Sequence, residues 1–63
     1  MDEDAFNMAV RKFLKEVGVT SQREIERIVR EHDIDNGRLK LRMTLTAEGT
    51  PLRHEVHAEI PLR

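Results

Sequence analysis

Apolar and polar side chains alternate along two runs in the C-terminal part of the chain. From Arg38 to Ala47 the odd-numbered positions are apolar, and from Leu52 to Leu62 the even-numbered positions are apolar, apart from His54. Successive side chains of a strand point to opposite faces, so each run forms a strand with one apolar and one polar face. The pattern predicts a β-hairpin with strands over about residues 38–47 and 52–60.

The residues between the runs allow more than one turn. Glu48 and Gly49 can form a two-residue turn. A turn at Gly49 and Thr50 would also align the faces, but it would require a backbone N–H from Pro51, which proline lacks. We therefore predict pairing around Glu48–Gly49, with favourable charge pairs on the polar face. The predicted opposite pairs are Leu45–Leu52, Met43–His54, Leu41–Val56, Leu39–Ala58, Arg42–Glu55 and Arg38–Glu59.

The N-terminal half predicts two helices, over about residues 4–17 and 22–31. Asp2 or Asp4 can cap the first helix, whose apolar residues recur at helical spacing. Gly18 follows the last of them and predicts a left-handed stop with a positive φ. Ser21 and Glu24 have the spacing of a capping box and would start the second helix. The apolar faces comprise Phe6, Ala9, Val10, Phe13, Leu14 and Val17 in the first helix, and Ile25, Ile28 and Val29 in the second.

Asn36–Gly37 predicts a turn before the first strand, which gives the order helix, helix, strand, strand. The expected fold class is α+β, one small domain over residues 1–63, with a helical hairpin on the apolar face of the β-hairpin. A two-stranded hairpin is marginal alone, and a 63-residue chain buries little surface. Without cysteine it has no disulfide to compensate. We therefore expect a homodimer that completes a four-stranded antiparallel sheet.

Composition excludes several classes of function. The formal net charge is −1, with both signs interspersed, so the chain has no bulk attraction for nucleic acid or an anionic membrane. Only Phe6 and Phe13 are aromatic, which removes most stacking platforms for single-stranded nucleic acid. No apolar run is long enough to cross a membrane, and the acidic start is unlike a signal peptide. The absence of cysteine fits a reducing compartment, and we expect a cytoplasmic protein.

Two segments resemble motifs without completing them. Gly18–Ile25 is similar to the turn and recognition-helix start of a helix-turn-helix DNA reader, but Glu24 occupies the position of the apolar anchor. The arginines of that helix alternate with glutamates that oppose phosphate binding. Asp33–Gly37 resembles a calcium loop, yet its glycine comes one position early and Thr44 stands in place of the bidentate glutamate. A capped helical hairpin and an ordinary turn are the favoured interpretations.

Catalytic and metal chemistry have little support in the sequence. His54 and His57 lie on opposite faces of a strand, so they cannot share a metal within one chain. His54 is the polar residue in an apolar row, which suggests a rim or dimer-contact histidine, or a pH-sensitive contact. The sequence has no cysteine nucleophile and no glycine-rich phosphate loop. We predict that the protein is not an enzyme and has no cofactor, metal site or catalytic residues.

The segments Asp2–Val29 and Met43–Thr46 carry a family resemblance. Within them, Arg11–Glu26 (RKFLKEVGVTSQREIE) and the strand MTLT are the most distinctive. The chain resembles a family of short, uncharacterised bacterial proteins, a domain of unknown function. That resemblance implies no activity, cofactor or catalytic residue, and it supports a small bacterial protein of the cytoplasm.

The predicted function is that of a small structural or interaction protein that acts as a homodimer. The two copies would lie side by side or exchange elements through the connection His32–Gly37. The alternative is a small nucleic-acid-binding or regulatory protein that uses the helical hairpin. The predicted dimer interface is formed by Leu39, Leu41, Met43, Val56 and Ile60. The predicted nucleic-acid contacts of the alternative are Arg23, Arg27 and Arg30.

Overall fold

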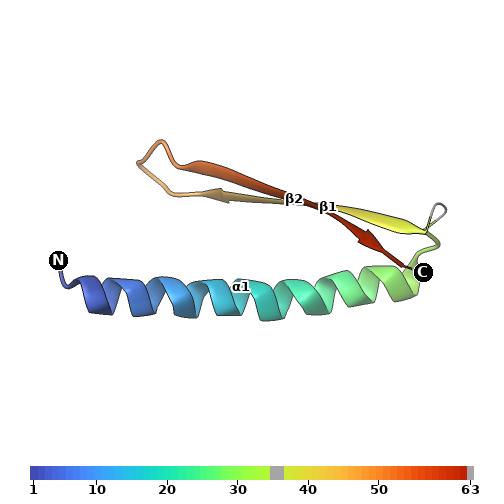
Figure 1. Cartoon of the computed structure of the whole chain (residues 1–63), viewed down its shortest axis with the longest axis horizontal. Coiled ribbons are helices and arrows are strands. Elements are labelled where there is room, and N and C mark those ends of the chain that lie inside the picture. The colour runs from blue at the N-terminus through green and yellow to red at the C-terminus, as the bar shows by residue number, and fades with distance from the viewer. Residues whose placement is uncertain (35–36, 63) are drawn as a thin grey trace. The chain divides into compact units, whose positions relative to one another are not determined.

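The computed structural model describes residues 1–34 and 37–62. It contains one helix, α1 (Glu3–Glu31), followed by two strands, β1 (Arg38–Thr46) and β2 (Arg53–Pro61), as Figure 1 shows. The predicted α+β class and the β-hairpin are confirmed. The chain divides into two compact units, Met1–Asp33 and Ile34–Arg63, which are described separately below. That the whole chain forms a single domain stays a prediction.

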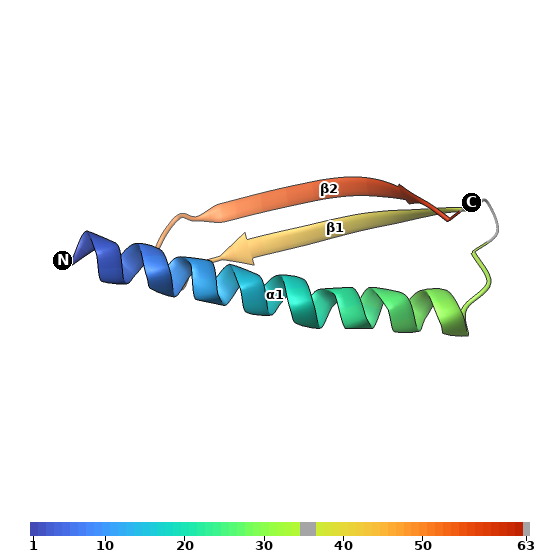
Figure 2. The same ribbon diagram turned by 60° about the horizontal axis from the view of Figure 1, so that its bottom comes forward.

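The first unit is one uninterrupted helix, so the predicted division into helices 4–17 and 22–31 is wrong. Gly18 and Ser21 lie inside α1, and the positive φ values among the described glycines belong to Gly37 and Gly49. The predicted stop at Gly18 and the capping box at Ser21 are therefore not formed. Figure 2 shows the helix continuing through this region.

Continuity of α1 follows from the balance of backbone hydrogen bonds. A glycine inside a helix costs about 1 kcal/mol relative to alanine. A break would instead create two additional helix ends, each with four backbone groups that lack intrahelical partners. The Thr20 hydroxyl is also satisfied inside the helix, because it donates to the carbonyl of Glu16 at 2.8 Å. In addition, the apolar faces of the two predicted helices are in phase, because one row of residues at three- or four-residue spacing connects them. This row comprises Val17, Ser21, Ile25 and Ile28.

Both ends of α1 agree with the sequence. Asp2 is the N-cap, and its carboxylate accepts hydrogen bonds from the backbone N–H of Asp4 at 3.0 Å and Ala5 at 3.2 Å. This arrangement satisfies two N–H groups of the first turn. The helix ends at Glu31, where the backbone N–H of His32 donates to the carbonyl of Ile28 at 3.0 Å. Of the two predicted caps, Asp2 and Asp4, the structure has Asp2, and the predicted end near residue 31 is confirmed.

The second unit is a twisted two-stranded antiparallel hairpin (Figures 1 and 2). Its register differs by two residues from the predicted one: Leu45 lies opposite His54, and Leu41 lies opposite Ala58. A shift of two leaves every side chain on its predicted face. The observed register is the one that a turn at Gly49 and Thr50 would give, which the sequence disfavours because Pro51 has no backbone N–H.

A loop of six residues, Ala47–Leu52, explains this register. The backbone N–H of Thr50 donates to the carbonyl of Ala47 at 3.2 Å, and Gly49 has a φ of 74°. The Thr50 hydroxyl donates to the same carbonyl at 2.9 Å and accepts from the N–H of Leu52 at 3.2 Å. The turn therefore closes before Pro51, which does not have to donate a hydrogen bond.

At the open end of the hairpin the ladder continues beyond the strands. The N–H of Leu62 donates to the carbonyl of Gly37 at 2.8 Å, and Gly37 has a φ of 70°. A left-handed φ of this kind favours glycine. Asn36, the other half of the predicted Asn36–Gly37 turn, lies outside the described residues, as does Asp35.

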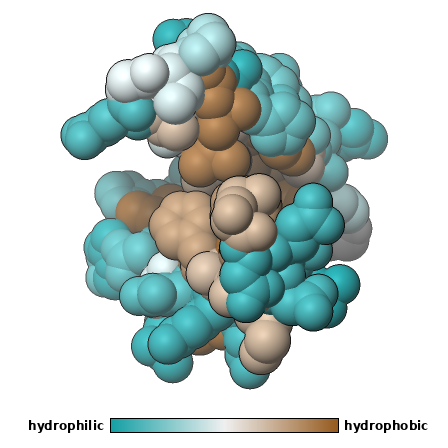
Figure 3. All heavy atoms as spheres, turned by 90° about the vertical axis from the view of Figure 1, so that its left-hand side faces the viewer, coloured by the Kyte–Doolittle hydropathy of each residue, from teal (hydrophilic) through white to brown (hydrophobic). Residues whose placement is uncertain are grey.

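No residue in the described ranges 1–34 and 37–62 is buried. This is unusual for a chain whose hydrophobic residues make up 38% of the total. Figure 3, viewed from the N-terminal end of α1, shows apolar side chains in tan and brown that reach the surface among polar ones. The candidate functional surfaces are therefore those that expose apolar groups.

Candidate interaction surface

One side of the hairpin carries its apolar side chains, and we call it the hairpin apolar face. Residues that lie directly opposite one another in an antiparallel pair point to the same side. All five residues of the predicted dimer interface lie on this face. Met43, Val56 and Ile60 remain exposed, by 44%, 52% and 40% respectively, whereas Leu39 and Leu41 are half-buried. The opposite pairs on this face are Leu39–Ile60, Leu41–Ala58, Met43–Val56 and Leu45–His54.

His54 is the polar residue on the hairpin apolar face. It lies opposite Leu45, not opposite Met43 as predicted. The His54 ring lies near the loop end of the hairpin. It occupies a position at which an apolar side chain would complete the apolar row of β2. This position is consistent with the predicted role at a rim or contact, and that role itself stays a prediction.

The other side of the hairpin is polar and carries charges of both signs. Arg38 and Glu59 form an ion pair of 3.6 Å, although they lie diagonally across the strands and not directly opposite. The predicted Arg42–Glu55 pairing is wrong, because Arg42 lies opposite His57. These surface ion pairs contribute at most about 1 kcal/mol each.

Glu55 instead bonds to its neighbours along β2. Its carboxylate oxygens lie 3.2 Å from a guanidinium nitrogen of Arg53 and 3.3 Å from Nε2 of His57. All three residues occupy the same face of a single strand, at two-residue spacing. This row was not predicted from the sequence. Its signal was the alternation of basic and acidic residue types at every second position from Arg53 to Glu59.

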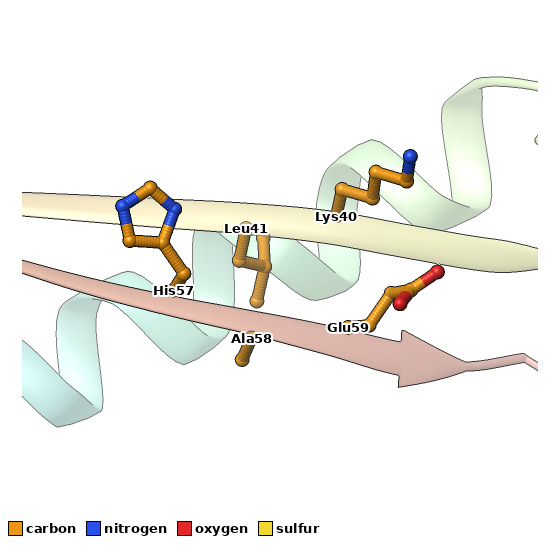
Figure 4. Close-up of a pocket in the computed structure, with 5 residues that line it drawn as sticks. All are labelled: Lys40, Leu41, His57, Ala58 and Glu59. Carbon is orange, nitrogen blue, oxygen red and sulfur yellow. The ribbon is translucent and has the colours of Figure 1, made fainter.

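A shallow depression of about 310 Å³ lies on the hairpin, lined by Lys40, Leu41, His57, Ala58 and Glu59. Figure 4 shows the polar side chains of Lys40, His57 and Glu59 pointing to one side of the hairpin and Ala58 to the other. Lys40 and Glu59 are directly opposite and have opposite charges. The depression therefore presents no uniform charge to a cation or an anion, and it lacks the enclosure typical of small-molecule sites.

The helix carries a second exposed apolar surface, which we call the α1 stripe. Its members recur at three- and four-residue spacing, the pattern of one helix face. Phe6, Phe13 and Leu14 are about half exposed, by 51%, 50% and 52%. The stripe runs along most of the helix and comprises Phe6, Val10, Phe13, Leu14, Val17, Ile25, Ile28 and Val29.

The predicted nucleic-acid contacts Arg23, Arg27 and Arg30 lie on one side of the last part of α1. Arg27 is engaged within the helix, since its guanidinium lies 2.8 Å from Glu24 and 3.1 Å from Glu31. The hydrogen bond and charge of Glu24 raise the pKa of Arg27 above its ordinary value. Residues 3–31 form one helix, so the turn that a helix-turn-helix reader requires is not formed.

Neither a metal-binding cluster nor a membrane-spanning helix is found within residues 1–34 and 37–62. Among the described residues no three His, Asp or Glu side chains are placed to hold a metal ion. His54 and His57 lie on opposite faces of β2. Asp35 and Asn36 of the calcium-like segment are outside the described ranges. α1, the helix within those ranges, is too polar along its length to cross a membrane.

The edges of the hairpin are the remaining candidate surface. A two-stranded sheet has two outer edges, whose backbone N–H and C=O groups can pair with a further strand. In the predicted four-stranded sheet of a homodimer, one of these edges pairs with the second copy. The structure places the hairpin apolar face and both edges on the same unit.

Comparison with known proteins gives a family and no activity. A family model described as "Family of unknown function (DUF6494)" matches residues 1–63. Neither the curated proteins nor the solved structures contain a match to the chain.

Proposed function

The chain belongs to DUF6494, a family of unknown function, and we propose that it is a structural or interaction protein that acts as a homodimer. The observation that carries this proposal is the exposure of apolar side chains on both units. Burial of apolar surface is the dominant favourable contribution to folding and to most association. Among the described residues none is buried, so this contribution remains available to a second copy.

The apolar side chains that stay exposed on each unit support a partner of this kind. On the hairpin, Met43, Val56 and Ile60 are 44%, 52% and 40% exposed, and on α1 Phe6, Phe13 and Leu14 are 51%, 50% and 52% exposed. Full burial of a side chain of this size contributes about 1.5 to 3 kcal/mol. Burial against a second copy would recover part of that contribution.

A second copy is the simplest partner, because it brings the same surfaces. A two-fold axis perpendicular to the plane of the hairpin places an edge strand antiparallel to the same strand of the second copy. It also keeps the hairpin apolar faces of both copies on one side of the sheet. The product is a four-stranded antiparallel sheet whose common apolar face is about 19 Å wide. Exchange of α1 between the copies is a variant of the same proposal, since it reuses the same surfaces.

The test is the mass of the folded protein in solution. We expect sedimentation equilibrium at tens of micromolar to give twice 7.4 kDa, with a cooperative unfolding transition whose midpoint rises with protein concentration. A folded species of 7.4 kDa under these conditions would exclude the homodimer. A midpoint that rises with protein concentration indicates that folding and dimerisation are coupled. A midpoint that does not change indicates a folded chain that associates only in concentrated samples.

The nucleic-acid alternative has no observation in its favour. Its helical hairpin is replaced by a continuous α1, and Arg27 is paired with two glutamates. A gel shift at low salt is the control, because phosphate-driven binding weakens steeply as salt rises. We also propose that the protein is not an enzyme and that it works in a reducing compartment, the cytoplasm, since it has no cysteine.

A further inference from the structure

The two outer edges of the hairpin differ in the residues that they present. The Leu62–Gly37 hydrogen bond identifies residues 37 and 62 as a hydrogen-bonded pair. Bonded and non-bonded pairs alternate along an antiparallel ladder, so the pair Arg38–Pro61 and every second pair after it are non-bonded. The backbone N–H and C=O groups of those residues point outward. On β1 the outward residues are Arg38, Lys40, Arg42, Thr44 and Thr46, and on β2 they are Arg53, Glu55, His57, Glu59 and Pro61.

We infer that the two copies join through β2, with Val56 on the two-fold axis. This inference rests on the homodimer proposed above and names the edge that forms it. In this register residues 53–59 pair with their own copy. Arg53 then lies opposite Glu59 of the second copy, and Glu55 lies opposite His57 of the second copy.

Charge complementarity selects this register. Because of the two-fold symmetry, the pairs Arg53–Glu59 and Glu55–His57 each occur twice. Every outward residue from Arg53 to Glu59 therefore lies opposite a residue of opposite charge or in a glutamate–histidine pair. Opposite charges directly across two strands are favourable, and like charges are unfavourable. In the single chain Glu55 contacts Arg53 and His57 along its own strand, and Glu59 contacts Arg38. The dimer gives Arg53 and His57 additional acidic neighbours.

Pro61 excludes the full-length register of β2. Pairing all of Arg53–Pro61 with its copy would place Glu55 opposite Glu59 of the second copy. It would also place Pro61 in a hydrogen-bonded pair, where it has no N–H to donate. The register centred on Val56 leaves Pro61 beyond the paired segment and forms a continuous ladder.

The β1 edge lacks this complementarity. Three of its outward residues, Arg38, Lys40 and Arg42, are cations, and none is an acid. Cationic side chains on an edge strand discourage pairing with other strands. In the full-length register of β1 with its own copy, Arg42 would face Arg42. The β1 edge is therefore the outer edge of the four-stranded sheet.

Single cysteine variants test the inference, since the native chain has no cysteine. Val56 of the two copies forms a non-bonded pair, whose Cα atoms are about 4.5 Å apart and can be joined by a disulfide. Met43 is the matched control, because it lies opposite Val56 on the same face but belongs to β1. We expect Val56→Cys to cross-link under mild oxidation at least about tenfold faster than Met43→Cys, in protein that sediments as a dimer when reduced.

Each outcome has a consequence. Faster cross-linking of Met43→Cys would overturn the assignment to β2. Failure of both variants to cross-link, in protein that still sediments as a dimer, would overturn the edge and leave the homodimer standing. A folded monomer would overturn both proposals.

Charge reversal gives a second test that does not depend on cysteine. Arg53→Glu places two glutamates opposite each other twice in the dimer, so we expect the dimer dissociation constant to rise about tenfold. Arg42→Glu, on the β1 edge, is expected to change it by less than about threefold. An equal effect of the two variants, with folding checked by circular dichroism, would contradict the assignment.

Discussion

Met43 lies directly opposite Val56 across the hairpin, and the two side chains are 44% and 52% exposed. They point to the same side, in the middle of the hairpin apolar face. An exposed apolar pair at the centre of a face loses the stabilisation that burial provides, about 25 cal/mol for each Å² of apolar surface.

We predict that the hairpin apolar face is required for the folded dimer. Leu41→Lys places a charge on this face, where a second copy would desolvate it without a partner. We expect loss of the dimer and of NMR chemical-shift dispersion. Arg42→Lys, on the polar face of the same strand, should change the free energy of unfolding by less than about 1 kcal/mol. A Leu41→Lys variant as stable as the original protein would contradict the role of this face.

Gly18→Ala is predicted to stabilise the protein. Gly18 lies inside α1 without a positive φ, and apart from its chain neighbours and the adjacent helix backbone no atom lies within 4 Å of an added Cβ. Alanine is favoured over glycine in a helix by about 0.5 to 1 kcal/mol. Urea denaturation should therefore show a higher midpoint at the same protein concentration. A destabilised variant would indicate that the helix breaks at this position.

The same substitution at Gly49 is predicted to have the opposite sign. Gly49 has a φ of 74°, and here too no atom lies within 4 Å of an added Cβ. The cost is therefore conformational, and we expect the free energy of unfolding to fall by about 1 kcal/mol or more. Because neither site is crowded, the pair of glycine variants isolates the effect of φ. Equal effects at both sites would refute the assigned turn.

Asp2 is predicted to stabilise α1 through its cap. Asp2→Ala removes the acceptor of the Asp4 and Ala5 N–H groups and should lower the free energy of unfolding by about 1 kcal/mol. Asp2→Asn keeps an acceptor oxygen and should cost less than half as much. Helicity measured by circular dichroism during thermal unfolding checks both variants. If Asp2→Asn were as destabilising as Asp2→Ala, charge and not the hydrogen bond would explain the effect.

Much of this fold was predictable from neighbouring residues. The two-residue alternation determined the strands and the face that each side chain occupies. The sequence limited the helix start to a cap at Asp2 or Asp4, and it predicted the helix end near Glu31. The alternating charges from Arg53 to Glu59 were also present in the sequence, but their meaning depends on which backbone groups point outward. The direction of these backbone groups follows from the Leu62–Gly37 hydrogen bond, which identifies the hydrogen-bonded pairs of the ladder.

The sequence by itself determined the element types and the two faces of the hairpin, while the tertiary structure decided the continuity of α1 and the pairing of the strands. At Gly18 and Ser21 the local signals for a break amount to about 1 to 2 kcal/mol of lost helix propensity, so the hydrogen bonds along the whole helix outweigh them. In the hairpin, a shift of two residues leaves every side chain on its face, so alternation alone cannot select a register. The hydrogen bonds of Thr50 select it, because they close the loop Ala47–Leu52, in which Pro51 does not have to donate a hydrogen bond.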